Sequence, residues 1–266
     1  MHEYKVSPRH PRAVSLRTRA KLVQGFEIGV TSTFGLFAHG RGEAFDYLVG
    51  EITTENAKHA IKAAAARLLL GHNSVLSING NVAALVPDEL IKLEKVSGAK
   101  LEINLYHRSE EREAAIEQVL KNAGAKEIYG IDPLYHETIP EIHSERRVVD
   151  HRGLFIADVA FVPLEDGDRT EGLVRLGKQV ITVDLNPLSR TAQMANITIV
   201  DNIVRAMPLL IKAVKKLRKE SEKALQSILS DFNNQQNLAE AILQINDRLS
   251  KLAEKQNHDK QGGIPT

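Results

Sequence analysis

The chain has 266 residues, of which 42% are hydrophobic and 26% charged, and its net charge is +1. This is the composition of a globular protein with a sizeable core, and it creates no field that would draw the chain to nucleic acid or to a membrane. The absence of cysteine excludes disulfides, thiolate catalysis and zinc–sulfur sites. Because there is neither a secretory signal nor an apolar run near the ~20 residues of a membrane span, we expect a cytoplasmic protein.

Short β-branched runs alternate with helical patterns along most of the chain. The predicted strands cover residues 75–78, 101–105, 126–130, 157–162, 179–183 and 197–200. The predicted helices include residues 16–23, 57–68, 87–96, 112–120, 169–176 and 189–194. This alternation predicts an α/β fold with a mostly parallel, doubly wound sheet and helices on both faces. Ligands on such sheets bind at the carboxyl ends of the strands.

The remaining segments set the expected domain organisation. Residues 131–153 have no clean period, so we expect a long loop there. From Ile203 onward the chain is predicted to be a helical extension. This extension carries a short heptad stripe formed by Leu238, Ile242, Ile245, Leu249 and Leu252. The stripe indicates either packing on the protein's own core or a dimer contact. We expect one domain at residues 1–255 and a disordered tail at 256–266.

The first candidate site is the glycine-containing segment 38–46. Gly40 and Gly42 would let backbone amides approach a phosphate, with Arg41 between them and a helix starting after them. Phe45 stands where a dinucleotide fingerprint needs its third glycine, and the ending of a Walker loop is absent. The pattern therefore indicates either a phosphate site or a plain glycine turn.

Two further candidates follow predicted strands. Residues 79–81, Asn-Gly-Asn, indicate either a self-contained turn or a substrate contact. Farther along, Asp168 with Glu171 three residues later predicts a helix cap. That cap does not use Glu165 or Asp166, and carboxylates gathered at a strand end suit Mg²⁺.

The last two predicted strands also end in polar residues. Residues 184–186 precede Ser189, a candidate helix cap that would place Arg190 and Thr191 beside an anion. Asn202 ends the final strand and would complete a cradle for a purine or a ribose. The alternative at each place is ordinary capping. The histidines lack the spacing of a transition-metal site.

Taken together, long segments of the chain resemble the archaeal phosphopantothenate synthetases, also called phosphopantoate–β-alanine ligases. The segments that carry the resemblance are residues 38–48, 79–87, 100–105, 162–171, 182–190 and 197–206. The resemblance runs in the same order over roughly residues 7–252, and its motifs are long and specific.

The resemblance implies a homodimer of Rossmann-like subunits on the coenzyme A pathway. Its implied substrates are ATP, phosphopantoate and β-alanine, and its implied products are AMP, pyrophosphate and phosphopantothenate. It also implies that ATP is bound by Arg19, Arg41, Asp184, Leu185, Asn186, Arg190, Thr191, Asn202 and Ile203.

On this basis we predict roles for individual residues. Arg41 and Arg190 would offset phosphate charge, and Glu43 would take a proton from β-alanine. The predicted substrate contacts are His39, Gly40, Asn81, Arg108, Asp168 and Arg169. The predicted Mg²⁺ ligands are Asp166 and Asp168. The phosphate of phosphopantoate is expected to meet Arg12, Arg108 or Arg112. The alternative function is a non-catalytic nucleotide sensor or assembly protein.

Overall fold

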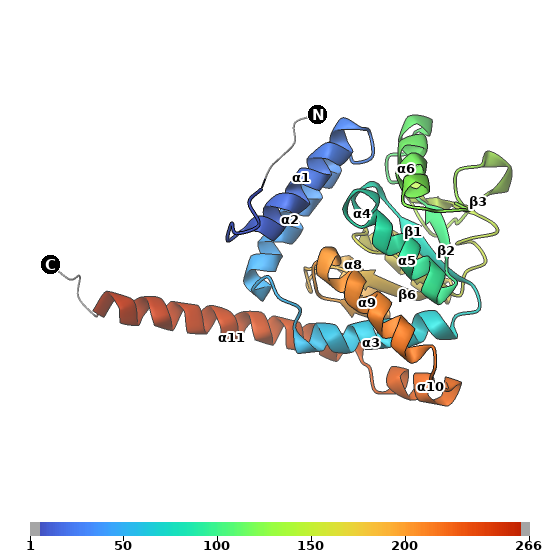
Figure 1. Cartoon of the computed structure of the whole chain (residues 1–266). Coiled ribbons are helices and arrows are strands. Elements are labelled where there is room, and N and C mark those ends of the chain that lie inside the picture. The colour runs from blue at the N-terminus through green and yellow to red at the C-terminus, as the bar shows by residue number, and fades with distance from the viewer. Residues whose placement is uncertain (1–5, 262–266) are drawn as a thin grey trace.

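The computed structural model describes residues 6–261, and its centre is a five-stranded sheet in the order β2-β1-β5-β6-β7. All four neighbouring pairs run parallel. The strands are β1 (Ser74–Ile78), β2 (Lys100–Ile103), β5 (Val159–Phe161), β6 (Gln179–Val183) and β7 (Ile197–Ile199). Helices surround this sheet (Figure 1), so the predicted α/β fold is confirmed.

Helices precede, connect and follow the strands. They are α1 (Ala13–Glu27), α2 (Thr33–Val49), α3 (Glu55–Leu70), α4 (Gly80–Leu85), α5 (Pro87–Ser97), α6 (Glu110–Asn122), α7 (Gly167–Arg175), α8 (Arg190–Met194), α9 (Ile203–Leu217), α10 (Glu222–Ser230) and α11 (Asn234–Gln261). Pro87 occupies the first turn of α5, and Gly98 ends it at a φ of 76° that favours glycine. Within residues 6–261, no helix is long and apolar enough to cross a membrane.

The strands direct alternate side chains into two apolar layers. Leu76 and Ile78 of β1 belong to the layer that includes residues of α3, α5 and α9, whereas Val75 belongs to the layer formed with α7 and the 139–157 segment. From β1 the chain passes to β2 on one side, and then returns to β5, β6 and β7 on the other. The direction of winding therefore reverses between β1 and β5, which is where doubly wound sheets bind ligands.

The segment 131–153 is more regular than predicted. It contains two short 3₁₀ turns, η1 (Pro133–Tyr135) and η2 (Glu145–Arg147), and an antiparallel ribbon of β3 (His136–Thr138) and β4 (Val148–Asp150). Each strand has only three residues, which is too short to give a periodic signal in the sequence. The strand predicted at 126–130 is reduced to one bridge between Tyr129 and Glu102.

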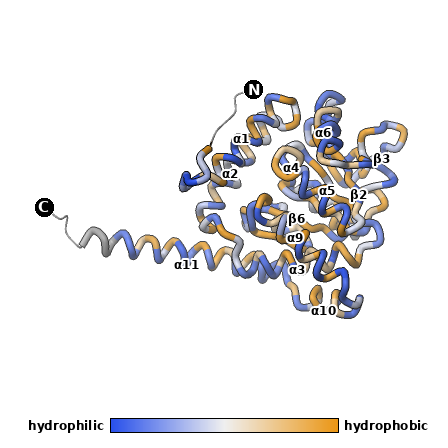
Figure 2. The backbone as a smooth tube through the Cα atoms, in the orientation of Figure 1, coloured by the Kyte–Doolittle hydropathy of each residue, from blue (hydrophilic) through white to orange (hydrophobic). Residues whose placement is uncertain are grey.

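The C-terminal helix α11 begins on the body of the protein and then projects away from it (Figure 1). Leu238 is buried in a small cluster with α8 and the end of β7, whereas Leu249 and Leu252 are 43% and 41% exposed. Figure 2 shows apolar residues recurring along the projecting part. The helix includes residues 256–261, where a disordered tail was expected. The rest of that predicted tail, 262–266, lies outside the described residues.

The buried carboxyl group of Glu102 predicts how stability depends on pH. Glu102 is fully buried and accepts a hydrogen bond from the backbone N–H of Asp150 at 3.2 Å and another from Leu154. Burial raises its pKa to about 7 from 4.5, although these hydrogen bonds oppose the shift. The folded state thus holds a proton that the unfolded state releases. This contribution is fully present below pH 4.5, and the free energy of unfolding falls by about 3 kcal/mol as the pH rises to about 7.

Urea denaturation at several pH values between 4 and 8 tests this prediction. The Glu102→Gln variant cannot titrate at this position, so its unfolding free energy should decline less over the same window. Identical declines in the two proteins would contradict the assignment to Glu102.

Candidate nucleotide-binding site

The glycine-containing segment lies inside helix α2, so both the phosphate loop and the glycine turn expected there are wrong. Ser32 caps α2 by accepting a hydrogen bond from the backbone N–H of Gly35 at 3.2 Å, and the helix continues to Val49. A Cβ added at Gly42 would lie 3.9 Å from Leu185, while Gly40 has open space around it. Because the helix uses their backbone amides, α2 can contact a ligand here chiefly through side chains.

Arg19 of α1 and Glu43 of α2 form a paired group. The Nε of Arg19 donates to both carboxylate oxygens of Glu43, at 3.1 and 2.9 Å, and Arg12 lies 3.8 Å from the same carboxylate. Tyr47 is hydrogen-bonded to Glu43 at 3.3 Å. His39 is on the same helix, and its buried Nε2 has no partner among the described residues. Burial lowers the pKa of His39, which favours a neutral ring.

The loop after β6 lies against α2. Asp184 accepts hydrogen bonds from the backbone N–H of Asn186 at 2.9 Å and from the hydroxyl of Ser189. Burial raises the pKa of Asp184, while these hydrogen bonds and the nearby charge of Arg41 act in the opposite direction. Arg41 is exposed. The structure therefore brings Arg41 and the predicted 184–186 segment together.

Helix α8 supplies the next two predicted residues. Ser189 caps it, as predicted, by accepting from the backbone N–H of Ala192 at 3.0 Å. Arg190 forms an ion pair with Glu171 of α7, and Thr191 donates to the backbone carbonyl of Glu165 at 2.9 Å. With five residues, α8 is too short to be expected to attract an anion through its N-terminus. Anion binding at this place would depend on the guanidinium of Arg190.

A buried carboxylate links α2 to the end of β7. Asp46 accepts from the side-chain amide of Asn202 at 2.9 Å and from Arg205 at 2.6 Å. Arg205 also pairs with Asp201 at 2.7 Å. Ile203 is buried at the start of α9, so its side chain belongs to the core. Helix α2 thus contacts the predicted nucleotide residues of α1, β6 and β7 through one face.

The predicted substrate residues are only partly brought together. Asn81 of α4 donates to the backbone carbonyl of Gly35 at 2.8 Å and so lies beside the start of α2. Asp168 instead accepts from the backbone N–H of His143 at 3.1 Å, and Arg169 is completely buried. The sequence identified these residues by their place after strands, which does not specify the direction of the side chains.

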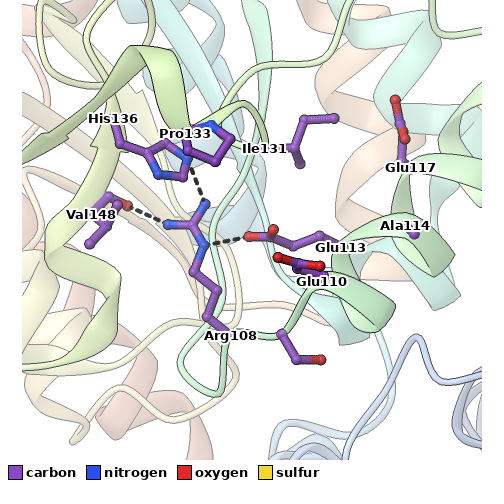
Figure 3. A pocket seen from close by; sticks show the side chains of 10 residues that line it. Arg108, Glu110, Glu113, Ala114, Glu117, Ile131, Pro133, His136 and Val148 are labelled. Carbon is purple, nitrogen blue, oxygen red and sulfur yellow. Dashed lines mark hydrogen bonds and ion pairs between the residues drawn. The ribbon is translucent and has the colours of Figure 1, made fainter.

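Arg108 lies elsewhere, in a pocket of about 550 Å³ between α6 and the β3–β4 ribbon. Its guanidinium contacts Glu113, donates to the backbone carbonyl of Val148 at 3.4 Å and lies 3.2 Å from a ring nitrogen of His136 (Figure 3). It also donates to the backbone carbonyl of Gly130. These partners already use its charge and its donors. The geometry does not support the predicted contact between Arg108 and a substrate phosphate.

The acidic segment after β5 is held by arginines. Asp166, and not the predicted Asp168, caps α7 by accepting from the backbone N–H of Arg169 at 3.0 Å. The other oxygen of Asp166 lies 3.1 Å from Arg146. Glu165 is 2.7 Å from both Arg146 and Arg169. Of the residues that the structure describes, no three His, Asp or Glu side chains gather as metal ligands. Carboxylates paired with arginines in this way do not fit a protein-built Mg²⁺ site.

Arg146 is the residue of this region that sequence reasoning missed. It lies in the aperiodic 131–153 segment, next to the exposed Arg147, and nothing in the local pattern distinguishes the two. Only the fold shows that Arg146 is 7% exposed and reaches the carboxyl ends of β2 and β5.

The parallel sheet, with arginines gathered at its carboxyl edge, defines a doubly wound α/β protein. The family model described as phosphopantothenate/pantothenate synthetase matches residues 56–248. The chain belongs to this family, as the resemblance in its sequence segments indicated.

Curated relatives extend the similarity over nearly the whole chain. The chain is 53% identical over 247 residues to the 4-phosphopantoate–β-alanine ligase of Thermococcus kodakarensis, covering 92% of this chain and 94% of that protein. It is 53% identical over 251 residues to the ligase of the same name from Thermococcus onnurineus, with 94% and 95% covered. It is 47% identical over 244 residues to that of Methanosarcina mazei, with 92% and 95% covered.

Proposed function

We propose that this protein is an ATP-dependent 4-phosphopantoate–β-alanine ligase of coenzyme A biosynthesis. The observation that carries the proposal is its 53% identity, over more than nine-tenths of the chain, to relatives with that name. The arrangement of Arg41, residues 184–186 and Asn202 around helix α2 supports it, because a nucleotide needs cations for its phosphates and polar groups for its base and ribose.

The proposed reaction has two steps. A carboxylate does not react with an amine at neutral pH, because oxide would have to leave. The carboxylate oxygen of phosphopantoate therefore attacks the α-phosphorus of ATP, and the bond to the bridging oxygen breaks to release pyrophosphate. The amine of β-alanine then attacks the carbonyl carbon of the acyl adenylate, AMP leaves, and the amine proton passes to a base. The products are phosphopantothenate, AMP and pyrophosphate.

The charges at the sheet edge suit the first step. Arg41 and Arg190 would offset the charge that grows on the phosphates as pyrophosphate leaves. Arg41 is exposed beside Asp184, whereas Arg190 would exchange its surface partner Glu171 for a phosphate. In this proposal Mg²⁺ is bound mainly by the triphosphate, as is common for this ion, and no step depends on a protein carboxylate binding it.

Glu43 fits a positioning role better than the predicted role of proton acceptor. Its carboxylate is bound by Arg19 and lies near Arg12. Its oxygens are thus engaged by arginines, and one of them also accepts a hydrogen bond from the hydroxyl of Tyr47, so the carboxylate is not placed to take a proton from β-alanine. We therefore assign Glu43 to holding Arg19 beside the nucleotide.

Pyrophosphate release from the purified protein tests the function. The reaction contains ATP, Mg²⁺, phosphopantoate and β-alanine, and each component is omitted in turn. AMP and phosphopantothenate that form only in the complete mixture would establish the ligase. Nucleotide binding without turnover in the complete mixture would instead favour a nucleotide sensor.

We also propose that the protein is a homodimer whose subunits meet along α11. Exposed Leu249 and Leu252 would pair with a second copy, because apolar side chains at heptad spacing gain by mutual burial. The double variant Leu249→Glu, Leu252→Glu is expected to halve the mass seen by size-exclusion chromatography with light scattering. Ser250→Glu, which adds charge to an exposed position outside the stripe, should leave the dimer intact. A dimer that survives the double variant would rule out this contact.

A further inference from the structure

Three arginines gather near the reversal of winding between β1 and β5, and one of them, Arg112, is among the contacts of the substrate phosphate predicted from the sequence. They are Arg112 of α6, Arg146 of η2 and Arg169 of α7. Because these residues come from three separate segments, the fold and not a local motif brings them together. Their surroundings indicate what kind of ligand they would accept.

Arg146 and Arg169 share one buried carboxylate. A carboxylate oxygen of Glu165 lies 2.7 Å from the Nη1 of each arginine. Arg169 also donates to the hydroxyl of Ser77 at 2.9 Å. Arg169 is 0% exposed, yet its Nε and Nη2 have no hydrogen-bond partner among residues 6–261. Buried donors in folded proteins are almost always paired, so these two N–H groups lack the acceptor that such donors usually have.

Arg112 also lies at the end of β1, the strand whose Ser77 binds Arg169. Its Nη2 donates to the backbone carbonyl of Val30 at 3.2 Å and lies over Gly80, at the end of β1. Its buried Nε has no partner in the described part of the chain. Burial lowers the pKa of Arg112, and the positive charge of Arg146 lowers it further. Both side chains reach the segment that follows β2, because Arg112 donates to the backbone carbonyl of His107 and Arg146 to that of Asn104 at 3.1 Å.

The balance of charge in this group is positive. Three guanidinium groups are accompanied by two carboxylates, Glu165 and Asp166, and the second lies 3.1 Å from Arg146. The group therefore carries one more positive than negative charge, and some of its buried N–H groups have no acceptor among the described residues. Both features favour the binding of an anion that accepts several hydrogen bonds. Phosphate monoesters have this character, and guanidinium groups match their geometry.

We propose that Arg112 and Arg146 bind the phosphate group of the acid substrate, and that Arg169 positions Arg146 through Glu165. This inference rests on the proposed function, which supplies a substrate with a carboxylate at one end and a phosphate at the other. The carboxylate must reach the nucleotide near Arg41, at the end of β6. The phosphate end of the substrate then extends along the carboxyl edge of the sheet toward β5 and β1. The 131–153 segment places Arg146 at this edge.

Steady-state kinetics of the full-length protein with phosphopantoate and with unphosphorylated pantoate test this assignment. Arg112→Gln is expected to raise the KM for phosphopantoate by about 10- to 100-fold, since a hydrogen bond to a charged group is lost. The KM for ATP should change less than about twofold, and the preference for phosphopantoate over pantoate should fall by the same factor as the KM rises. Arg146→Lys, which keeps the charge but not the planar fork, should act in the same direction.

The neighbouring Arg147 provides a matched control, because its side chain is exposed in the same turn. Arg147→Ala should leave both KM values unchanged. The melting temperature of each variant shows whether it folds. An unchanged preference for phosphopantoate in folded Arg112→Gln would overturn the proposal. A rise in the KM for ATP instead would assign these arginines to the nucleotide phosphates and would also overturn it.

Calorimetric titration without ATP separates this inference from the ligase proposal. Phosphopantoate should bind the wild-type protein, with inorganic phosphate as a competitor, and binding should weaken about 10-fold or more in Arg112→Gln. If the wild-type protein binds phosphopantoate in this way but shows no ligation, the proposed function fails while the site stands. If wild-type protein and Arg112→Gln bind phosphopantoate equally, or neither binds it, the site is disproved.

Discussion

Replacing Arg41 by alanine is expected to lower kcat/KM by roughly 10²- to 10³-fold, the range seen when one preorganised group that stabilises developing negative charge is removed. Arg41 is exposed on α2 beside Asp184, so its removal leaves no cavity and no buried charge. The melting temperature should therefore change little. A loss of activity without a loss of stability would place Arg41 in the chemistry of the nucleotide.

Two further variants sharpen the test of Arg41. Arg41→Lys keeps one positive charge and should retain part of the activity, since lysine cannot form the two parallel hydrogen bonds of a guanidinium. Arg17→Ala removes another exposed arginine, on the neighbouring helix α1, and should leave kcat/KM unchanged. If Arg41→Ala is as active as Arg17→Ala, then Arg41 has no part in the reaction.

Replacing Glu165 by alanine is expected to destabilise the protein by about 3–5 kcal/mol, because it leaves two buried guanidinium groups without their shared partner. Glu165 is 2.7 Å from both Arg146 and Arg169 and is fully enclosed by the fold. Burial raises its pKa although both arginines act to lower it, so the charge depends on these contacts. Urea denaturation at pH 7 measures the loss.

An exposed ion pair provides a control for the Glu165→Ala substitution. Glu117 pairs with Lys121 one turn later on α6 at 2.7 Å, and 54% of the lysine side chain is exposed. Such pairs contribute little, so Glu117→Ala should change the free energy of unfolding by less than about 1 kcal/mol. Equal effects of the two substitutions would mean that Glu165 is not the counter-charge of a buried cluster.

The elements that the sequence predicted well are those with local signals. Pro87 and Gly98 bound the helix predicted at 87–96, and Ser189 caps another by accepting from the backbone N–H three residues later. Valine and isoleucine runs located the core strands. These features depend on neighbours in the chain, which is the information a single sequence contains.

The errors have a common origin in contacts between distant segments. Two glycines disfavour a helix locally, but α2 persists because the buried Asp46 binds Asn202 and Arg205 of another element. Asp166 and Asp168 are both aspartates and could each cap a helix. Because α7 begins at Gly167, Asp166 is the residue that caps it. The predicted site residues of α2 lie with those that follow β6 and β7, while Arg108, Asp168 and Arg169 lie apart from them. Their catalytic and binding roles remain predictions.

The projecting helix α11 has a consequence for the shape of the molecule in solution. With 28 residues it is about 42 Å long, whereas a compact chain of this length has a radius of gyration of about 18 Å. A single subunit should therefore scatter X-rays as a globule with a rod attached, and its maximum dimension should exceed that of a sphere of equal mass. Because the rod adds length but little volume, such a protein should diffuse more slowly than its mass suggests.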